Sequence, residues 1–393
     1  MDYVIRQIES KIRHHLQAGK SVLLLGPRQT GKTTLIKHIS SQLSLSLISP
    51  RVRLRYEKDP SLLADEVEAL LDDSSHQIPL VIIDEVQKVP VIMDVVQDLI
   101  DRKIAQFILT GSSARKLKRG NTINLLPGRV IAMHLDPFSF DEIPHNLLTL
   151  DELLIYGALP EIILTSQYSD REELLNAYVS IYLEEEIRAE AIVRNLGHFA
   201  RFLELAASES GQIVNFTKLS NEIGVAHTTI ASYYQILEDC LIVERIDPLT
   251  QSRTRKKLSK SHKYIFFDLG VRRIAAREGI KPPTEYIGRL FEQFIALELI
   301  RKIRTLNLRA KLHYWRDLNG PEIDWVISFE NKLIPCEVKW TESPKSSDIR
   351  HLNIFLQEYP EAKTGYVICR TPRKLKLRDN IYAIPWQMVH DLI

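Results

Sequence analysis

The stretch Gly26-Pro27-Arg28-Gln29-Thr30-Gly31-Lys32-Thr33 decides the fold of the first part of this chain. It has the spacing G-x-x-x-x-G-K-[ST] and lies where the apolar run Ser21–Leu25 would lead from a buried strand into a helix. The glycines allow the backbone to curl, so that successive N–H groups point at an anion. We therefore expect the loop and the following Thr34 to bind a nucleotide, with Lys32 on the β- and γ-phosphates and Thr33 on Mg²⁺. The apolar run before the loop argues against a chance glycine-rich turn.

A second apolar run, Leu80–Ile83, continues into Asp84 and Glu85, as in a parallel strand that is buried on both faces. Asp84 would complete the Mg²⁺ shell, and Glu85 would orient or deprotonate the attacking water. A third run, Gln106–Thr110, leads into Gly111-Ser112-Ser113. Ser112 would lie beside the γ-phosphate, although an ordinary Ser/Gly turn explains these residues equally well.

Composition limits the class of protein. A chain of 393 residues should form two or three domains, and its 45% apolar and 26% charged residues are those of a soluble globular protein. The formal net charge of +2 confines any nucleic-acid role to local patches. Its three cysteines have no metal-binding spacing, no apolar run approaches the ~20 residues of a membrane span, and no signal peptide is recognisable. We therefore expect a cytoplasmic protein without a membrane partner.

The order of apolar runs and turn residues predicts an α/β protein with several modules. Residues 1–148 alternate strands and helices, as in a parallel sheet flanked by helices, and residues 149–210 form a helical connector. Residues 211–275 predict a winged helix-turn-helix, and residues 285–393 a last α/β domain.

Nucleic-acid binding by the winged-helix region is left open by its sequence. The helices Phe216–Ile223 and His227–Asp239 should be followed by the strands Leu241–Ile246 and Lys263–Phe267. Between the strands, the segment Arg253–Lys263 carries six Lys or Arg residues and no acid, which would suit phosphates of DNA or RNA on an exposed loop. The second helix holds no Lys or Arg, so a packing role is equally consistent with it.

The C-terminal domain collects carboxylates and a lysine. Two apolar runs flanking residues 330–332 should form a hairpin that brings Asp324, Glu337 and Lys339 to one face, and a helical stripe turns Glu292 inward. Such a set suits metal-assisted phosphodiester hydrolysis, with Glu292, Asp324 and Glu337 as metal ligands and Asp324, Glu337 and Lys339 as catalytic groups. A structural ion-pair cluster is the alternative. Because packed carboxylates repel, we expect either a bound Mg²⁺ or Mn²⁺ or a carboxyl group with a raised pKa.

In this order, the motifs resemble a widespread prokaryotic family of AAA-type P-loop ATPases with a C-terminal domain of unknown function. The resemblance covers nearly the whole chain, and its last motif is similar to the core of the PD-(D/E)XK nucleases. The matching residues are Gly26–Thr33, Asp84–Gln87, Leu109–Ser113, Pro127–Arg129, Tyr156–Glu161, Lys263–Gly270, Gly288–Glu292 and the set Asp324, Glu337 and Lys339.

The resemblance implies ATP and Mg²⁺ binding and an AAA-type P-loop sheet followed by a winged helix and a restriction-endonuclease-like domain. It also implies that Glu85 is the catalytic base and that Ser112 or Arg129 senses the nucleotide, with Arg129 acting in its own subunit or across to a neighbour of a homo-oligomer. Two residues depart from the family pattern: Ala158 replaces a usual glycine, and Glu322-Ile-Asp324 replaces a proline-acid pair.

Two functions of different classes are compatible with these features. In the first, nucleotide state controls a C-terminal nuclease that acts on nucleic acid. In the second, the chain is a nucleotide-dependent switch or scaffold whose C-terminal domain binds nucleic acid or protein without cutting. The intact set of Asp324, Glu337 and Lys339 favours the first, whereas the near-neutral charge and the absence of Lys and Arg from the second helix favour the other.

Overall fold

The computed structural model describes residues 3–73, 78–112, 126–144, 147–183, 195–250, 258–317 and 320–393. The chain divides into two units. Unit 1 comprises Met1–Phe138 and Asp239–Leu241, and unit 2 comprises Ser139–Glu238 and Ile242–Ile393. Part of the basic segment predicted to contact nucleic acid, residues 253–257, lies outside the described residues, as does Ser113.

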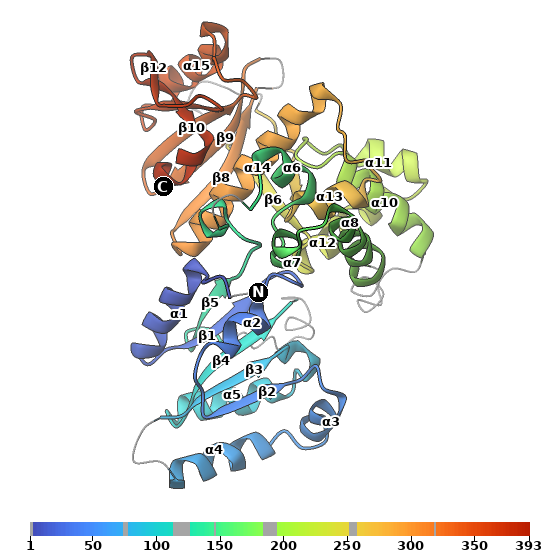
Figure 1. Ribbon diagram of the computed structural model, residues 1–393, viewed down its shortest axis with the longest axis vertical. Helices are drawn as coiled ribbons and strands as arrows, with labels where there is room; N and C mark the ends of the chain where they lie inside the picture. Colours follow the sequence, from blue (N-terminus) through green and yellow to red (C-terminus); the bar gives the residue numbers. More distant parts are fainter. Residues whose placement is uncertain are drawn as a thin grey trace. The chain divides into compact units, whose positions relative to one another are not determined.

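Unit 1 contains a parallel sheet in the order β2-β3-β4-β1-β5 (Figure 1). All of its strands run the same way, so their carboxyl ends share one edge, which carries the phosphate-loop sequence after β1. The elements are α1 (Gln7–Gln17), β1 (Ser21–Leu25), α2 (Lys32–Lys37), β2 (Leu43–Ser46), α3 (Pro50–Lys58), α4 (Leu62–Asp73), β3 (Leu80–Asp84), η1 (Val86–Lys88), α5 (Ile92–Asp101), β4 (Gln106–Gly111) and β5 (Val130–His134).

Alternation along the buried strands distributes the core of unit 1 over both faces of the sheet. Val22 and Leu24 of β1 pack in one apolar cluster with residues of α1 and α2, whereas Leu23 packs in another with residues of α3, α4 and α5. Side chains of a strand alternate between faces, so helices cover the sheet on both sides. The predicted α/β class with a parallel sheet is thereby confirmed.

Unit 2 begins with helices. The chain breaks between α6 and α7 at Gly157–Leu159, inside the segment 149–210 for which the sequence predicts helices. The helical elements are η2 (Phe140–Glu142), α6 (Leu150–Tyr156), α7 (Pro160–Leu164), α8 (Tyr168–Ala177), the π-helical η3 (Tyr178–Leu183), α10 (Leu196–Ser208), α11 (Phe216–Ile223), α12 (His227–Asp239), α13 (Leu269–Ala275), α14 (Thr284–Thr305), η4 (Ser346–Ile349), α15 (Arg350–Glu358) and η5 (Trp386–Leu392).

A mixed sheet, in the order β12-β13-β11-β10-β9-β8-β6-β7, forms the other part of unit 2 (Figure 1). Residues of α15 pack in one apolar cluster with β8, β9, β11 and β13. The strands are β6 (Val243–Pro248), β7 (Lys263–Phe266), β8 (Ala310–Arg316), β9 (Glu322–Phe329), β10 (Lys332–Val338), β11 (Gly365–Cys369), β12 (Leu375–Arg378) and β13 (Ile381–Pro385).

The sheet of unit 2 crosses the predicted boundary between residues 275 and 285. β6 pairs antiparallel with β7 and parallel with β8, through Asp247 and His313. The hairpin expected as the wing of a separate module is thus hydrogen-bonded to the C-terminal sheet. Sequence patterns did not indicate this pairing, because it joins segments more than sixty residues apart.

Two of the family-like motifs meet around one buried carboxylate in unit 2. Asp268, which is fully buried, caps α13 by accepting a hydrogen bond from Val271 N (3.1 Å) and also accepts one from Ala158 N (2.6 Å). A Cβ on Gly157 would lie 2.0 Å from Asp268 Oδ1, and a Cβ on Gly270 would lie 2.2 Å from a backbone oxygen. These motifs therefore lock helix α6 to α13 by close backbone packing.

None of the helices in the described part of the chain is long and apolar enough to cross a membrane.

Candidate functional site

The phosphate-loop sequence forms a tight curl at the carboxyl edge of the unit 1 sheet. Gln29 and Gly31 both have a positive φ, 60° and 94°, and Thr30 Oγ1 donates to Pro27 O (2.9 Å) to close the turn. Gly26 N donates to Gly111 O (3.2 Å), and a Cβ on Gly26 would lie 2.2 Å from Leu135 O. The loop thus passes between the ends of β4 and β5, where only a glycine fits.

The ammonium of Lys32 lies inside this curl. Lys32 is 5% exposed, and its Nζ donates to the carbonyls of Gly26 (2.7 Å) and Pro27 (2.8 Å). A buried cation costs free energy unless hydrogen bonds or a counterion compensate it. The carbonyls supply hydrogen bonds, and an anion in the loop would supply the charge.

Three oxygen-bearing side chains converge next to the loop. Thr33 Oγ1 donates to Asp84 Oδ2 (2.8 Å), and Thr110 Oγ1 donates to Asp84 Oδ1 (2.5 Å). Asp84 is 3% exposed and ends β3, while Thr110 is fully buried on the neighbouring β4. The sequence predicted that Thr33 and Asp84 share a site, and the two residues are in contact.

Glu85 follows Asp84 with a left-handed backbone, φ 60° and ψ 48°. A non-glycine residue in this region is uncommon and is found where surrounding contacts enforce it. Gln87 Nε2 donates to Glu85 Oε2 (2.5 Å), and Ser112 Oγ donates to the same oxygen (3.2 Å). The carboxylate is therefore held in one orientation beside the Asp84 cluster, and Ser112 lies in this group as the sequence suggested.

The residues present fit a nucleotide with Mg²⁺. Thr33 and Asp84 supply the hard oxygen ligands that Mg²⁺ prefers, and the loop provides a cradle that a Cβ on Gly26 would fill. Gln87 Oε1 is also buried without a hydrogen-bond partner among the described residues. A buried acceptor oxygen without a donor is typical of a site where a bound water molecule or ligand supplies the hydrogen bond.

Arg6 is a residue of this site that sequence reasoning missed. Its guanidinium is 5% exposed, donates to Thr30 O (2.8 Å) and Asp136 O (2.8 Å), and lies over the ring of Phe138 at 4.8 Å. It therefore ties the phosphate loop to the segment after β5. The only sequence signal was an arginine within the apolar context Val4-Ile5-Arg6, which does not name its partners.

Arg129 does not meet the phosphate loop of its own chain. It precedes β5, whose first residue Val130 pairs with Ser21 at the amino end of β1, the opposite edge of the sheet from Gly26. Its guanidinium instead pairs with both carboxylate oxygens of Asp101 (2.6 and 2.9 Å). Of the two possibilities that the sequence left open for Arg129, this position does not suit action within its own subunit, and action on a neighbouring subunit stays a prediction.

A second group of charged side chains gathers in unit 2. β9 and β10 form the expected hairpin, with Phe329 opposite Lys332 and Trp325 opposite Cys336. The next position in this register sets Asp324 opposite Glu337, and Asp324 Oδ2 accepts a hydrogen bond from Val338 N (2.8 Å). Lys339 Nζ lies 2.9 Å from Glu337 and 3.8 Å from Asp324. The sequence-predicted trio is therefore brought together.

The prediction that Glu292, Asp324 and Glu337 form a metal centre is not supported by their arrangement. Across the described ranges, no three Asp, Glu, His or Cys side chains are grouped closely enough to hold a metal ion. Lys263 takes a place in the cluster instead: its Nζ is 3.0 Å from Glu292 Oε1 and 4.6 Å from the ring centroid of Trp325.

Lys263 also corrects the prediction of an exposed basic loop ending at this residue. It is 9% exposed and begins β7. Its sequence context, a lysine before the apolar Tyr-Ile-Phe-Phe run, did not distinguish a buried cation from a surface one. Sequence reasoning therefore missed it as a member of the cluster.

The charges of this cluster shift the pKa values of its members. Burial, together with the charge of Asp324, raises the pKa of Glu337 well above its usual range. Burial raises the pKa of Glu292 to about 7, opposed by Lys263 and assisted by Asp324. Burial alone would lower the pKa of Lys339, but Asp324 and Glu337 outweigh it and raise the value. The raised pKa of Glu292 and Glu337 agrees with the second of the two expectations, a carboxyl with a raised pKa, and metal binding stays a prediction.

The raised pKa of Glu292 predicts a pH dependence for the stability of unit 2. Between about pH 4.5 and 7 the folded state keeps a proton that the unfolded state releases, so the free energy of unfolding falls as pH rises. We expect Glu292→Gln to make this fall shallower, whereas Glu285→Gln, an exposed change on the same helix, should leave it unchanged.

Urea denaturation followed by tryptophan fluorescence measures this effect, because all four tryptophans, Trp315, Trp325, Trp340 and Trp386, lie in unit 2. Equal pH dependence in the parent and Glu292→Gln would show that burial and the charge of Asp324 do not raise the pKa of Glu292 as inferred.

Three family models match consecutive segments of the chain, and the two candidate sites fall in different segments. Residues 18–144 match the family described as AAA domain, and the later residues 147–282 and 287–389 match the families described as Domain of unknown function (DUF8612) and Domain of unknown function (DUF4143). The chain contains an AAA domain followed by two domains of unknown function. The phosphate loop, Asp84, Glu85 and Ser112 all belong to the AAA domain, and the charged cluster of β9 and β10 belongs to the last match.

Relatives of similar length share this organisation without an assigned activity. An uncharacterized protein of Mycobacterium tuberculosis, Rv2008c, is 26% identical over 392 residues, which cover 97% of this AAA-domain chain and 83% of the relative. An uncharacterized protein of Methanocaldococcus jannaschii, MJ1637, is 22% identical over 436 residues. The match covers 98% of this chain and 88% of the relative.

Solved structures give weaker likenesses. The Aeropyrum pernix ORC1 protein in complex with DNA is 12% identical, with coverage of 72% of this chain and 93% of its own and a TM-score of 0.30. Cdc6p from Pyrobaculum aerophilum is 14% identical. The match covers 71% of this chain and 97% of Cdc6p, with a TM-score of 0.28. At such TM-scores the fold assignment rests on the parallel sheet of unit 1 and the AAA match.

Proposed function

We propose that unit 1 binds ATP with Mg²⁺ and hydrolyses it. The observation that carries this proposal is the convergence of Thr33, Asp84 and Thr110 beside the phosphate loop, with Glu85 held next to them. Thr33 and Asp84 would hold Mg²⁺, which neutralises phosphate charge when bound. The loop N–H groups and Lys32 bind and orient the phosphates, and Glu85 accepts the proton of the attacking water.

The test is release of inorganic phosphate from ATP by the purified chain with Mg²⁺ and with EDTA. Phosphate release only with Mg²⁺ is expected. Tight ATP binding without turnover in the presence of Mg²⁺ would instead support a non-hydrolysing nucleotide switch.

For unit 2 we propose nucleic-acid binding without cleavage, so that the chain acts as a nucleotide-dependent switch. The supporting observation is that the ammonium of Lys263, 3.0 Å from Glu292, already supplies a positive charge beside the carboxylates that a nuclease would use for metal. The helices α11 and α12 with the β6–β7 hairpin also keep the outline of a winged helix, which favours a nucleic-acid partner.

Removing Lys263 is expected to create a divalent-cation site. In Lys263→Met, Glu292 and Asp324 lose the positive charge of Lys263, and Mn²⁺ would relieve the repulsion between these two carboxylates. We expect calorimetry to detect Mn²⁺ binding at least about tenfold tighter than in the parent, because hard carboxylate oxygens suit such ions. The added substitution Asp324→Asn should remove the gain.

Mn²⁺ binding by the parent that disappears in Asp324→Asn, together with Mn²⁺-dependent nicking of DNA or RNA, would contradict binding without cleavage and restore the nuclease hypothesis. Retained tryptophan fluorescence in Lys263→Met, checked against Lys263→Gln, verifies that unit 2 remains folded.

A further inference from the structure

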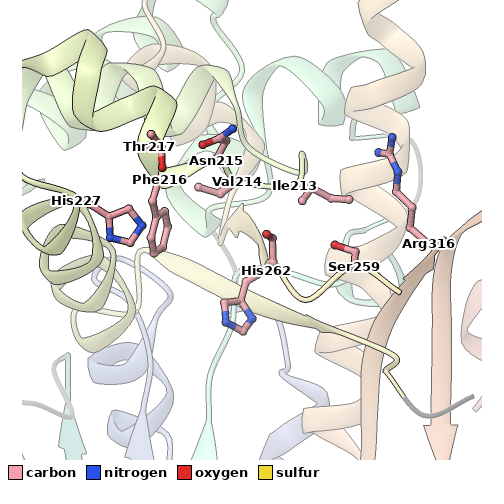
Figure 2. A pocket seen from close by; sticks show the side chains of 10 residues that line it. Ile213, Val214, Asn215, Phe216, Thr217, His227, Ser259, His262 and Arg316 are labelled. Atoms are coloured by element: carbon pink, nitrogen blue, oxygen red, sulfur yellow. The ribbon is translucent and has the colours of Figure 1, made fainter. Parts of the chain in front are cut away.

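A cavity of about 570 Å³ lies in unit 2 where the start of α11, the start of α12 and the chain before β7 come together. This volume is within the range of pockets that hold small organic ligands. Figure 2 shows Phe216 and His227 at one end of the cavity, Arg316 at the other, and Ser259 and His262 between them. Its lining therefore combines flat rings, hydrogen-bonding groups and a cation.

The aromatic end of the cavity is supported from behind. The rings of Phe216 and His227 meet edge to face, with centroids 5.3 Å apart. Phe216 stacks on Tyr234 (5.5 Å, 19° between planes), and Tyr234 stacks on Tyr264 (4.1 Å, 20°). A row of stacked rings fixes the orientation of Phe216, so its face is a preformed surface for another planar group.

The opposite end carries a positive charge that a ligand can recruit. Arg316 is at the end of β8, and its side chain is 48% exposed. Its guanidinium lies 3.5 Å from Glu322, an equally exposed partner. Such exposed pairs contribute little to stability, so a phosphate can replace Glu322 at little cost.

A smaller cavity of about 100 Å³ shares Ile213 and Arg316 with the first. It is lined by Lys263, Glu292 and Asp324 of the charged cluster. Arg316 therefore lies between the aromatic rings of the first cavity and the charged cluster at the second.

We propose that the cavity is a binding site for one unpaired nucleotide of a nucleic-acid strand, with the base against Phe216 and His227 and the phosphate on Arg316. This inference rests on the proposed nucleic-acid role of unit 2 and names the site. Base-on-ring stacking tolerates any sequence. Between the two ends, Ser259 Oγ is hydrogen-bonded to Tyr314 (3.0 Å) and His262 Nδ1 lies 2.9 Å from Asp247, which leaves Nε2 of His262 as the polar contact to a base edge. A base paired in a duplex cannot enter, so the site selects single strands.

The experiment measures fluorescence anisotropy of the full chain with labelled oligonucleotides of about 20 nucleotides, a length that spans single-strand sites. The probes are oligo(dU), oligo(U) and a DNA duplex of equal length. We expect both single strands to bind tighter than the duplex. The difference in affinity between the DNA strand and the RNA strand shows whether the site prefers deoxyribose or ribose.

Two substitutions test the cavity. Phe216→Leu keeps an apolar side chain but loses the ring, and should weaken single-strand binding about tenfold, as expected for one stacked base. Arg316→Gln should weaken it severalfold and lower the salt dependence by about one counterion. Arg309→Gln, an exposed arginine of the same unit outside the cavity, is the matched control and should change affinity less than twofold. Unchanged tryptophan fluorescence confirms that each variant is folded.

The outcomes separate the two proposals. Absence of binding to every oligonucleotide overturns the nucleic-acid role and the cavity site together. Single-strand binding that neither Phe216→Leu nor Arg316→Gln weakens beyond Arg309→Gln overturns the cavity site alone, as does equal binding of the duplex.

Discussion

Replacing Glu85 by glutamine is expected to lower the rate of ATP hydrolysis at least about 100-fold while ATP binding stays within a fewfold of the parent, since a positioned general base contributes on the order of 10²–10⁴ to a rate. Glutamine keeps the size of the side chain and its contacts with Gln87 and Ser112, but it cannot accept a proton. The phosphate loop is unchanged. ATP should therefore bind and persist.

Lys32→Ala should have a different signature, because it removes the charge inside the loop. Both binding and turnover should fall, as expected when ground-state and transition-state contacts are lost together. Phosphate release gives the rates, and calorimetry with ATP gives the affinities. Glu57→Gln, an exposed change on α3 of the same unit, is the matched control and should alter neither.

A Glu85→Gln variant that hydrolyses ATP at the parental rate would show that another group activates the water. A Lys32→Ala variant with parental affinity would show that the N–H groups of the curl suffice for the phosphates. Either result would remove that residue from the proposed mechanism without affecting the other.

Local spacing predicted those parts of the site that lie within one turn or one hairpin. The phosphate loop specifies its own backbone through Gly26 and Gly31, and strand parity brought Asp324 to Glu337. Contacts between distant segments left no such pattern. Arg6 reaches Thr30 and Asp136, and Lys263 reaches Glu292, because the fold closes around them.

The same limit explains why the sequence left open on which subunit Arg129 would act. The sequence places it after a Pro-Gly turn and gives no register for the strand that follows, which sequence analysis did not identify. Only the pairing of Val130 with Ser21 sets Arg129 at the amino edge of the sheet. A residue just before a strand and a residue just after it are equally near the strand in sequence. In the folded sheet they lie at opposite edges, one at the amino ends of the strands and the other at the carboxyl ends.

The second large effect is expected at Gly157, where we predict that alanine lowers the free energy of unfolding of unit 2 by at least ~3 kcal/mol, the upper range for single substitutions that break a special backbone site. Gly157 has φ 74° and ψ −159°, a region that is essentially restricted to glycine. A Cβ there would also lie 2.0 Å from Asp268 Oδ1, and Asp268 is fully buried and cannot swing into solvent.

Gly224 provides a matched control for the backbone contribution. It ends α11 in the same unit with φ 78° and ψ 36°, and a Cβ would meet nothing within 4 Å. Gly224→Ala should therefore cost only about 1–2 kcal/mol, the left-handed penalty of an L-residue. The difference between the two variants isolates the collision with Asp268.

Urea denaturation followed by tryptophan fluorescence reports this difference for unit 2 alone, since unit 1 contains no tryptophan. ATP binding by unit 1 should survive in Gly157→Ala at temperatures where unit 2 has lost its folded fluorescence, because the phosphate loop and Asp84 belong to a separate core. If Gly157→Ala destabilises no more than Gly224→Ala, the Asp268 carboxylate must move freely. In that case the hydrogen bond from Ala158 N does not lock α6 to α13, and close packing of the two motifs is not what maintains this part of the fold.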